Sequence, residues 1–224
     1  MKDPYVYENT EILINKLNIR DEKVLLQAEA DLTTQRLIDI DDEILSNKTQ
    51  FDFKHIKKIH QYIFQDIYEW AGVPRTVNIA KPEEVLNGLS VEYTDKNFIE
   101  ENMNKALVRL NEVDWKNLSL GMKSKEFTRR LADVWKVHPF REGNTRTIIK
   151  FSCQYAKTNG FPMKEELFKD YSNYVRKSLV LASIGEYAEY KYLERIIKDA
   201  IEQGQNEQIE FYEEEKEDDW EMEL

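Results

Sequence analysis

Apolar residues recur at intervals of three and four along most of the chain, which is the spacing that one buried face of an α-helix produces. The clearest example is the segment 54–70, whose apolar stripe consists of Ile56, Ile59, Ile63, Ile67 and Trp70. The same spacing predicts further helices over about residues 23–40, 95–110, 123–138, 144–158, 164–184 and 186–203. The sequence therefore predicts an all-α fold.

Residues 75–93 break this helical pattern. Polar and apolar residues alternate from Arg75 to Ile79, the segment from Lys81 to Gly88 has the composition of a turn, and residues 89–93 alternate again. Alternation with a period of two is typical of a half-buried strand, and two such runs around a turn predict a hairpin. We expect this segment to form a single small β-hairpin.

The helical pattern is also interrupted at residues 138–147. Pro139 disfavours helical geometry at His138, so the helix before it is expected to end there. The next helix is expected to start at Asn144 or Thr145, directly after Gly143, and to end near residue 158. A short loop therefore joins two helices at this point.

Length and composition predict one domain over residues 1–204, with N-terminal helices in 1–50, a core in 51–160 and C-terminal helices in 161–204. Residues 205–224 are acidic and lack periodicity, so we expect a disordered tail. The net charge of −11 disfavours nucleic acid as a partner, and no apolar run is long enough to span a membrane. No secretion signal is recognisable, so a cytoplasmic protein is expected.

The few metal-binding or redox-active side chains are scattered. The chain has one cysteine, Cys153, which excludes an internal disulfide, and three histidines too dispersed for a zinc site. We expect His60 to be packed in the core and His55 to be exposed. The third, His138, lies in the loop described above.

This loop concentrates chemistry for phosphate groups. A helix that starts after Gly143 leaves backbone N–H groups unpaired and carries the positive end of the helix dipole, which suits an anion. Gly143 permits close backbone approach, Asn144 can cap the helix or donate to a phosphate oxygen, and Arg146 can clamp a phosphate. Glu142, together with substrate phosphates, can hold Mg²⁺.

His138 completes this set as a base that titrates near neutrality and can accept a proton from a hydroxyl. The combination indicates transfer of a phosphorus-centred group from a nucleotide to a hydroxyl. Other readings remain for single residues: His138 lies on an apolar stripe and can be a packed residue, and Glu142 and Arg146 can form a surface ion pair. The occurrence of all of them around Gly143-Asn144 favours the chemical reading.

The segment 138–146, His-Pro-Phe-Arg-Glu-Gly-Asn-Thr-Arg, resembles the signature of the Fic family, His-x-Phe-x-(Asp/Glu)-Gly-Asn-Gly-Arg-x-x-Arg. Residues 66–72 and 75–81 resemble the family's segment that leads into its flap, and the similarity extends over about residues 3–200. The resemblance implies an all-helical domain with a small β-hairpin flap next to the active-site loop.

The resemblance also implies an activity: transfer of AMP from ATP to a Ser, Thr or Tyr hydroxyl of a target protein, with release of pyrophosphate. In that reading His138 is the general base, Glu142 binds Mg²⁺, and the ATP phosphates meet Gly143, Asn144, Thr145, Arg146 and Lys81. The flap residues near the target's backbone are Ile79, Ala80 and Lys81. For the hairpin, target docking and a purely structural cover are equally open.

Two positions depart from the signature: Thr145 stands where the family has its second glycine, and Ile149 where it has its final arginine. No Ser or Thr in the chain is followed four residues later by Glu, so the family's inhibitory motif is missing. We expect control by a separate antitoxin-like inhibitor, by self-association or by the acidic tail. A phosphotransferase of the Doc type and a non-catalytic nucleotide- or partner-binding module remain as alternatives.

Overall fold

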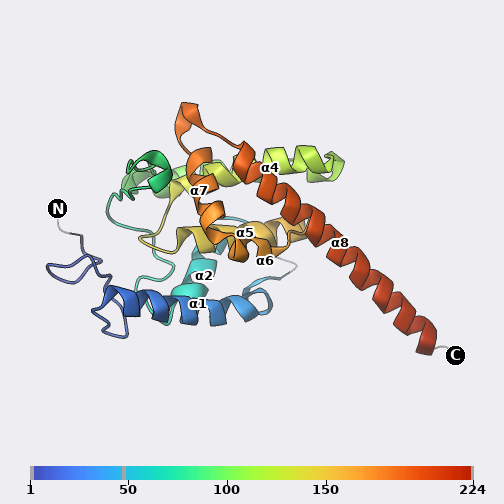
Figure 1. Cartoon of the computed structure of the whole chain (residues 1–224), viewed down its shortest axis with the longest axis horizontal. Coiled ribbons are helices and arrows are strands. Elements are labelled where there is room, and N and C mark those ends of the chain that lie inside the picture. Colours follow the sequence, from blue (N-terminus) through green and yellow to red (C-terminus); the bar gives the residue numbers. More distant parts are fainter. Residues whose placement is uncertain (1–2, 47–48, 223–224) are drawn as a thin grey trace.

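The computed structural model describes residues 3–46 and 49–222, and side chains as far as residue 210. This part of the chain is mostly helical (Figure 1), as predicted. Its helices are α1 Glu22–Ile44, α2 Phe53–Phe64, α3 Ile99–Asn111, α4 Leu120–Val137, α5 Asn144–Thr158, α6 Glu165–Asp170, α7 Ser172–Ala182 and α8 Lys191–Met222. Single 3-10 turns lie at Glu84–Leu86, Lys96–Phe98, Trp115–Asn117 and Gly185–Tyr187. No helix in these residues is long and apolar enough to cross a membrane.

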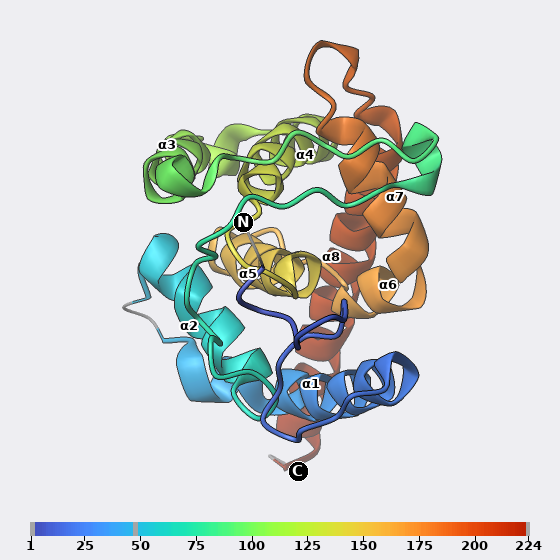
Figure 2. The same ribbon diagram turned by 90° about the vertical axis from the view of Figure 1, so that its left-hand side faces the viewer.

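Helix α5 lies at the centre of the molecule. Figures 1 and 2 show α1 and α2 on one side of it, α3 and α4 on the opposite side, and α6 to α8 along a third. Every residue of α5 from Thr147 to Ala156 is buried, as expected for a helix that is enclosed by its neighbours. The active-site candidates at its N-terminus therefore rest on a helix that is buried on all sides.

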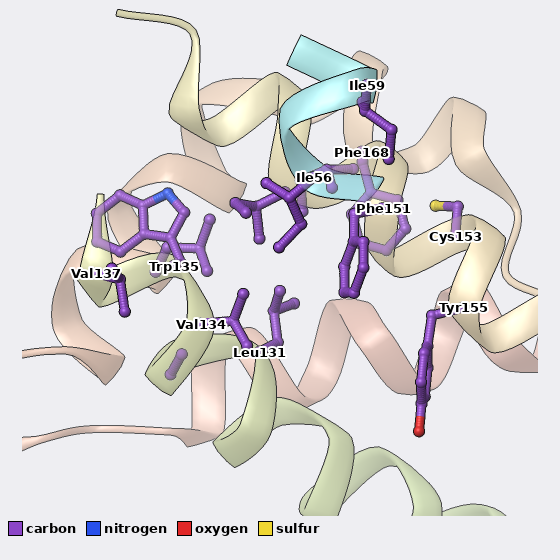
Figure 3. Packing of buried hydrophobic residues seen from close by; sticks show 14 of the residues in the cluster. Ile56, Ile59, Leu131, Val134, Trp135, Val137, Phe151, Cys153, Tyr155 and Phe168 are labelled. Carbon is purple, nitrogen blue, oxygen red and sulfur yellow. The ribbon is translucent and has the colours of Figure 1, made fainter. Parts of the chain in front are cut away.

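The core joins α5 to the helices around it. Figure 3 shows Ile56 of α2, Leu131 and Val134 of α4 and Phe151 of α5 around the same part of the core, with Trp135 of α4 beside them. Trp135 is fully buried and Phe151 is 1% exposed. Burial of each such side chain contributes about 1.5–3 kcal/mol, so this cluster holds α4 and α5, and the loop between them, in place.

Some helix boundaries differ from the expectation. Helix α2 ends at Phe64 rather than at residue 70, and the chain turns at Gly72, which has a φ of 80°. The N-terminal segment holds the stretch between Phe64 and Gly72 in place, because the Lys16 backbone N–H donates to the Ile67 carbonyl. The single helix expected over 164–184 is two helices, α6 and α7, which meet at Tyr171.

The C-terminal helix is longer than predicted. We expected disorder from residue 205, whereas α8 continues to Met222 and projects away from the body (Figure 1); the last two residues of the predicted tail, 223–224, lie outside the described residues. The close packing of α8 against the rest of the protein extends to about the predicted boundary. At Gly204 the helix lies so near the segment before α6 that an added Cβ would be 2.6 Å from the Pro162 carbonyl oxygen. Beyond that point glutamate, a strong helix former, is the most frequent residue, which favours continuation of the helix.

The predicted β-hairpin at 75–93 is not formed as a sheet. Its two arms run side by side across to α7 (Figure 2), and the tip is closed by the Glu83 N–H donating to the Leu89 carbonyl at 3.0 Å, but no strand is assigned anywhere in this segment. Pro82 has no N–H to donate, and the Lys81 N–H donates to the Ser90 hydroxyl at 3.0 Å instead of to a backbone carbonyl. We call residues 75–93 the flap segment.

Candidate active site

The loop between α4 and α5 has the shape that its sequence predicts. His138 ends α4 in the left-handed region, with φ 50° and ψ 60°, and Gly143 precedes α5 with a φ of 78°. Positive φ is uncommon for a residue other than glycine, and Pro139 excludes the helical alternative. Both predicted boundaries, at residues 138 and 144, are confirmed.

Asn144 and His60 brace this loop from within the protein. The Asn144 side chain accepts from the Phe140 N–H and donates to the Phe140 carbonyl, both at 2.8 Å. His60 stacks on the Phe140 ring at 3.7 Å, accepts from the Gly72 N–H through Nδ1 at 2.8 Å, and therefore donates through Nε2 to the Glu142 carbonyl at 3.1 Å. The core role expected for His60 is confirmed. The Asn144 side-chain amide holds the backbone of the loop at Phe140.

Arg75 ties the loop to the flap segment, a role that sequence reasoning missed. Its backbone N–H donates to the Pro139 carbonyl at 2.8 Å, and its guanidinium donates to the His138 carbonyl at 2.9 Å and to the Val77 and Thr94 carbonyls. Burial lowers the pKa of this side chain. A lone buried arginine in an alternating run carries no local signal of such a role, because its carbonyl partners come from distant parts of the chain.

His138 is fully buried, with one ring nitrogen free to act as a base. Nδ1 donates to the Trp135 carbonyl at 3.3 Å, which leaves the lone pair on Nε2, and Nε2 has no hydrogen-bond partner among the described residues. The ring stacks on Tyr93 at 4.0 Å. Burial, followed by the charges of Lys81 and Arg176, holds the pKa of His138 well below 6.5, so the imidazole is neutral at pH 7.

Glu142 lies beside His138 in the loop and is ionised. Its Oε2 accepts from Lys81 Nζ at 2.7 Å, and its Oε1 accepts from the Gly143 N–H at 3.0 Å. Burial by itself raises the pKa of this carboxyl, but the charge and hydrogen bond of Lys81, together with the Gly143 N–H and the charge of Arg146, outweigh it and bring the value to about 2. Lys81, predicted on the flap, thus reaches the candidate metal ligand.

No group of three potential metal-ligating side chains occurs within residues 3–46 and 49–222. A cation held here would have to take a single protein carboxylate and complete its coordination with substrate oxygens and water, which is a coordination that Mg²⁺ accepts. Glu142 is the carboxylate available for it. In the structure the Lys81 ammonium neutralises this carboxylate.

The first turn of α5 is open to an anion. Gly143 provides no side-chain cap, and the N–H groups of Asn144, Thr145 and Arg146 have no backbone acceptor within the described part of the chain. Glycine is required at 143 both by its φ and by space, since a Cβ there would lie 2.2 Å from the Phe64 ring. The N–H groups expected from the sequence are therefore present and uncapped.

The two remaining predicted site residues of α5 face different neighbours. Thr145 Oγ1 accepts from Trp135 Nε1 at 3.0 Å. Arg146 turns to α1, where it pairs with Glu29, donates to Thr33 Oγ1 at 2.9 Å and lies 4.8 Å over the Phe64 ring. The surface ion pair of Arg146 with Glu142, one of the open readings, is not formed, because each has another partner.

The rest of the flap segment is arranged over the loop. Ile79 and Ala80 line a cavity of about 440 Å³ between the two arms, together with Val91 and Tyr93.

Ile149, the residue at the signature's arginine position, is 8% exposed and belongs to the core.

His55 differs from the expectation. It is 6% exposed instead of exposed, and its Nε2 is 2.8 Å from Gln154 Oε1. Its position on α2 faces α5, a neighbour that only the assembled fold reveals.

The chain is similar to known proteins over most of its length. Residues 50–155 match the model of the Fic/DOC family. Protein adenylyltransferase VbhT of Bartonella schoenbuchensis is 31% identical over 189 residues, which cover 83% of this chain and 36% of that protein. This chain thus spans about a third of VbhT. Probable protein adenylyltransferase y4lH of Sinorhizobium fredii is 30% identical over 169 residues, which cover 74% of this chain and 81% of that protein.

The fold has the same relatives. BepC of Bartonella tribocorum, a VirB-translocated effector protein solved with bound AMPPNP, matches with a TM-score of 0.66 at 19% identity, over 88% of this chain and 95% of that one. The identity to y4lH over most of both chains, the family match across the loop and the shared fold agree with one another. The chain belongs to the Fic/DOC family.

Proposed function

We propose that this protein transfers AMP from ATP to a hydroxyl side chain of a target protein and releases pyrophosphate. The observation that carries the proposal is the unpartnered Nε2 of a neutral, buried His138, held in the same short loop as Glu142 and the uncapped N-terminus of α5. Relatives of about 30% identity are named protein adenylyltransferases, and BepC binds an ATP analogue, which supports the same reading.

In the proposed reaction, His138 Nε2 takes the proton of the attacking Ser, Thr or Tyr hydroxyl. The hydroxyl oxygen forms a bond to the α-phosphorus of ATP, and the bond from that phosphorus to the bridging oxygen breaks, so that pyrophosphate leaves with the electron pair. The unpaired N–H groups of Asn144, Thr145 and Arg146 stabilise the negative phosphate oxygens, assisted by the helix dipole, and the Gly143 N–H joins them once Glu142 Oε1 releases it. The reaction needs His138 neutral, and its lowered pKa maintains that form at pH 7.

Mg²⁺ is the metal that this site fits, with Glu142 as its protein ligand and nucleotide phosphates as the others. When bound, it neutralises charge on the phosphate oxygens. The contact between Lys81 and Glu142 has to open for the carboxylate to serve that purpose, after which the Lys81 ammonium is free to meet a phosphate.

The flap segment takes the role of target dock in this proposal. Ile79 and Ala80 form no backbone hydrogen bond with the opposite arm in the described structure, so an extended target segment can pair with them as an added strand. Because His138 is fully buried, the flap segment must move before a target hydroxyl reaches Nε2. In this proposal the flap segment both docks the target and opens the way to His138.

Intact mass spectrometry after incubation with ATP and Mg²⁺, alone and with a cell lysate, tests the proposal. We expect an increment of one adenylyl group on a protein hydroxyl. His138→Ala removes the base and should lower the initial rate about 10²- to 10⁴-fold. An unchanged rate in His138→Ala would contradict the assigned base, and the absence of any increment would favour a non-catalytic module.

The same experiment covers the Doc-type alternative, in which a phosphate-sized increment appears. Thr145 is the one position that favours this alternative, since it departs from the family's glycine, while Glu142 and Gly143 keep the pattern of the adenylyltransferase signature. Control by a separate inhibitor, by self-association or by residues 205–224 stays a prediction. Deletion of 205–224 tests the tail: a sharp rise in self-modification would identify it as the inhibitor.

A further inference from the structure

Helix α7 brings a cation to the first turn of α5 that sequence reasoning did not single out. Arg176 Nη1 lies 3.4 Å from Thr145 Oγ1, and the guanidinium lies 5.5 Å from the centre of the Trp135 ring. After Lys81, its charge is the largest electrostatic contribution that lowers the pKa of His138. Arg176 therefore lies close to the start of α5 and near enough to His138 for its charge to act on that ring.

The arginine that belongs to α5 itself is engaged elsewhere. Arg146 is paired with Glu29 on α1 and donates to Thr33, and Glu29 is only 8% exposed. Release of Arg146 would leave the Glu29 carboxylate buried with one partner fewer, which is unfavourable. The cations that can be exchanged at low cost therefore come from outside α5: Lys81 from the flap segment and Arg176 from α7.

Arg176 is held by a carboxylate of the flap segment. Its Nη2 pairs with Glu83 Oε1, and the Glu83 side chain is 11% exposed. No other partner of the Glu83 carboxylate occurs in the described residues. A carboxylate and a phosphate both offer paired oxygens that match the guanidinium fork, so an anionic ligand can take the place of Glu83 with the same geometry.

The hydrogen bonds of Thr145 also indicate an anionic ligand at the start of α5. Its hydroxyl oxygen has two lone pairs, which accept from Trp135 Nε1 at 3.0 Å and from Arg176 Nη1 at 3.4 Å. With both lone pairs engaged, only the hydroxyl proton remains, and it has no acceptor within the described residues. A side chain held in this way donates one hydrogen bond toward an acceptor at the start of α5, next to the uncapped N–H groups.

We propose that Arg176 binds the phosphate groups of the nucleotide in exchange for Glu83, with the Thr145 hydroxyl as an additional donor. The inference rests on the proposed function, since it concerns the nucleotide of that reaction. The exchange links two events: a nucleotide that takes Arg176 also releases the Glu83 contact that holds the flap segment down.

Two variants with opposite expected effects test the exchange. Arg176→Gln removes the cation and should weaken binding of ATP with Mg²⁺ about 10- to 100-fold, which corresponds to the loss of a charge-assisted hydrogen bond pair. Glu83→Gln removes the competing carboxylate and should strengthen binding about 2- to 10-fold, because the guanidinium no longer has to leave a charged partner. Isothermal titration calorimetry of the full chain measures both.

Two further variants serve as controls. Arg176→Lys keeps the charge without the fork and should recover part of the lost affinity. Lys177→Gln removes the neighbouring pair with Glu84, whose Lys177 side chain is 42% exposed, and should leave ATP affinity within about two-fold. Circular dichroism melting checks that each variant is folded.

The outcomes separate this inference from the proposed function. If the wild-type chain binds no ATP, both fail. If it binds ATP and the affinities of Arg176→Gln and Glu83→Gln change in the same direction, or that of Arg176→Gln is unchanged, Arg176 only anchors the flap segment and this inference alone is wrong. If Arg176→Gln does not fold, the other two variants still test the inference. It is wrong if Glu83→Gln binds ATP more weakly than the wild-type chain, or if Arg176→Lys binds ATP as tightly as the wild-type chain.

Discussion

Two arginine–glutamate pairs flank the first turn of α5, and they differ in what carries the glutamate. On one side Arg146 meets Glu29, which lies on the 23-residue helix α1 and also accepts from the Tyr68 hydroxyl. On the other side Arg176 meets Glu83, which lies on a flap segment without a β-ladder and has that single partner among the described residues. Both carboxylates are largely buried, at 8% and 11% exposure.

The difference shows that burial alone does not make an ion pair permanent. Glu29 cannot leave without unpacking α1 or exposing Tyr68, so the pair with Arg146 is a structural link. Glu83 can leave with its loop, because few backbone hydrogen bonds hold the flap segment and water can reach the carboxylate once it lifts. A reaction that needs positive charge at the start of α5 is better served by the pair that can open.

The largest expected effect distinguishes the two pairs by stability. Glu29→Gln should lower the free energy of unfolding by about 2–3 kcal/mol, less than for a fully buried pair because Arg146 is 34% exposed. Glu83→Gln should lower it by about 1 kcal/mol or less, since the loop can relax into water. Urea unfolding of both variants measures the difference, and equal losses would remove the distinction drawn here.

A smaller effect is expected from two tyrosines, one at each pair. Tyr68→Phe deletes the hydroxyl that donates to Glu29 and should cost about 1–2 kcal/mol of stability. Tyr93 is the last residue of the flap segment and stacks on His138, and its buried hydroxyl has no partner among the described residues. Tyr93→Phe should therefore be neutral or slightly stabilising. A substantial loss in Tyr93→Phe would indicate a hydrogen bond that the structure does not contain.

The last prediction concerns acid pH and the contact between Lys81 and Glu142. The folded pKa of Glu142 is lowered to about 2, while the unfolded value is 4.5. An unfolded carboxylate takes up a proton first as pH falls, so the stabilisation is fully present above about pH 4.5 and is lost as pH falls towards 2. Lys81→Met should move the folded pKa upward and shrink this window, which carboxyl titration by NMR detects. An unchanged Glu142 pKa would show that Lys81 is not its main partner.

Much of the candidate site was predictable because it is local. His138, Glu142, Gly143 and Thr145 lie within eight positions of one another, and two helices around a proline and a glycine can place them in only a few ways. The position of the flap segment in the sequence was predicted, but its secondary structure was not. Its alternation suggested strands, whereas Pro82 and side-chain bonds such as that of Ser90 replace the ladder.

The residues that the sequence did not reveal act through distant partners. Arg75 serves the loop through carbonyls of residues 138 and 139, and Arg176 reaches Thr145 from two helices later. Helix α8 extends beyond its predicted end for a different reason: apolar periodicity detects helices that pack, whereas a glutamate-rich sequence can form a helix without that periodicity.

The sequence by itself determined the helical class, the turn from α4 into α5 and the set of chemical groups in that turn, because these depend on the backbone preferences of neighbouring residues. Only the tertiary structure decided which glutamate meets which arginine. The pairs of Arg146 with Glu29 and of Arg176 with Glu83 join residues 117 and 93 positions apart. Charge attracts any opposite charge, so the choice of partner comes from the packing of α1, α5, α7 and the flap segment.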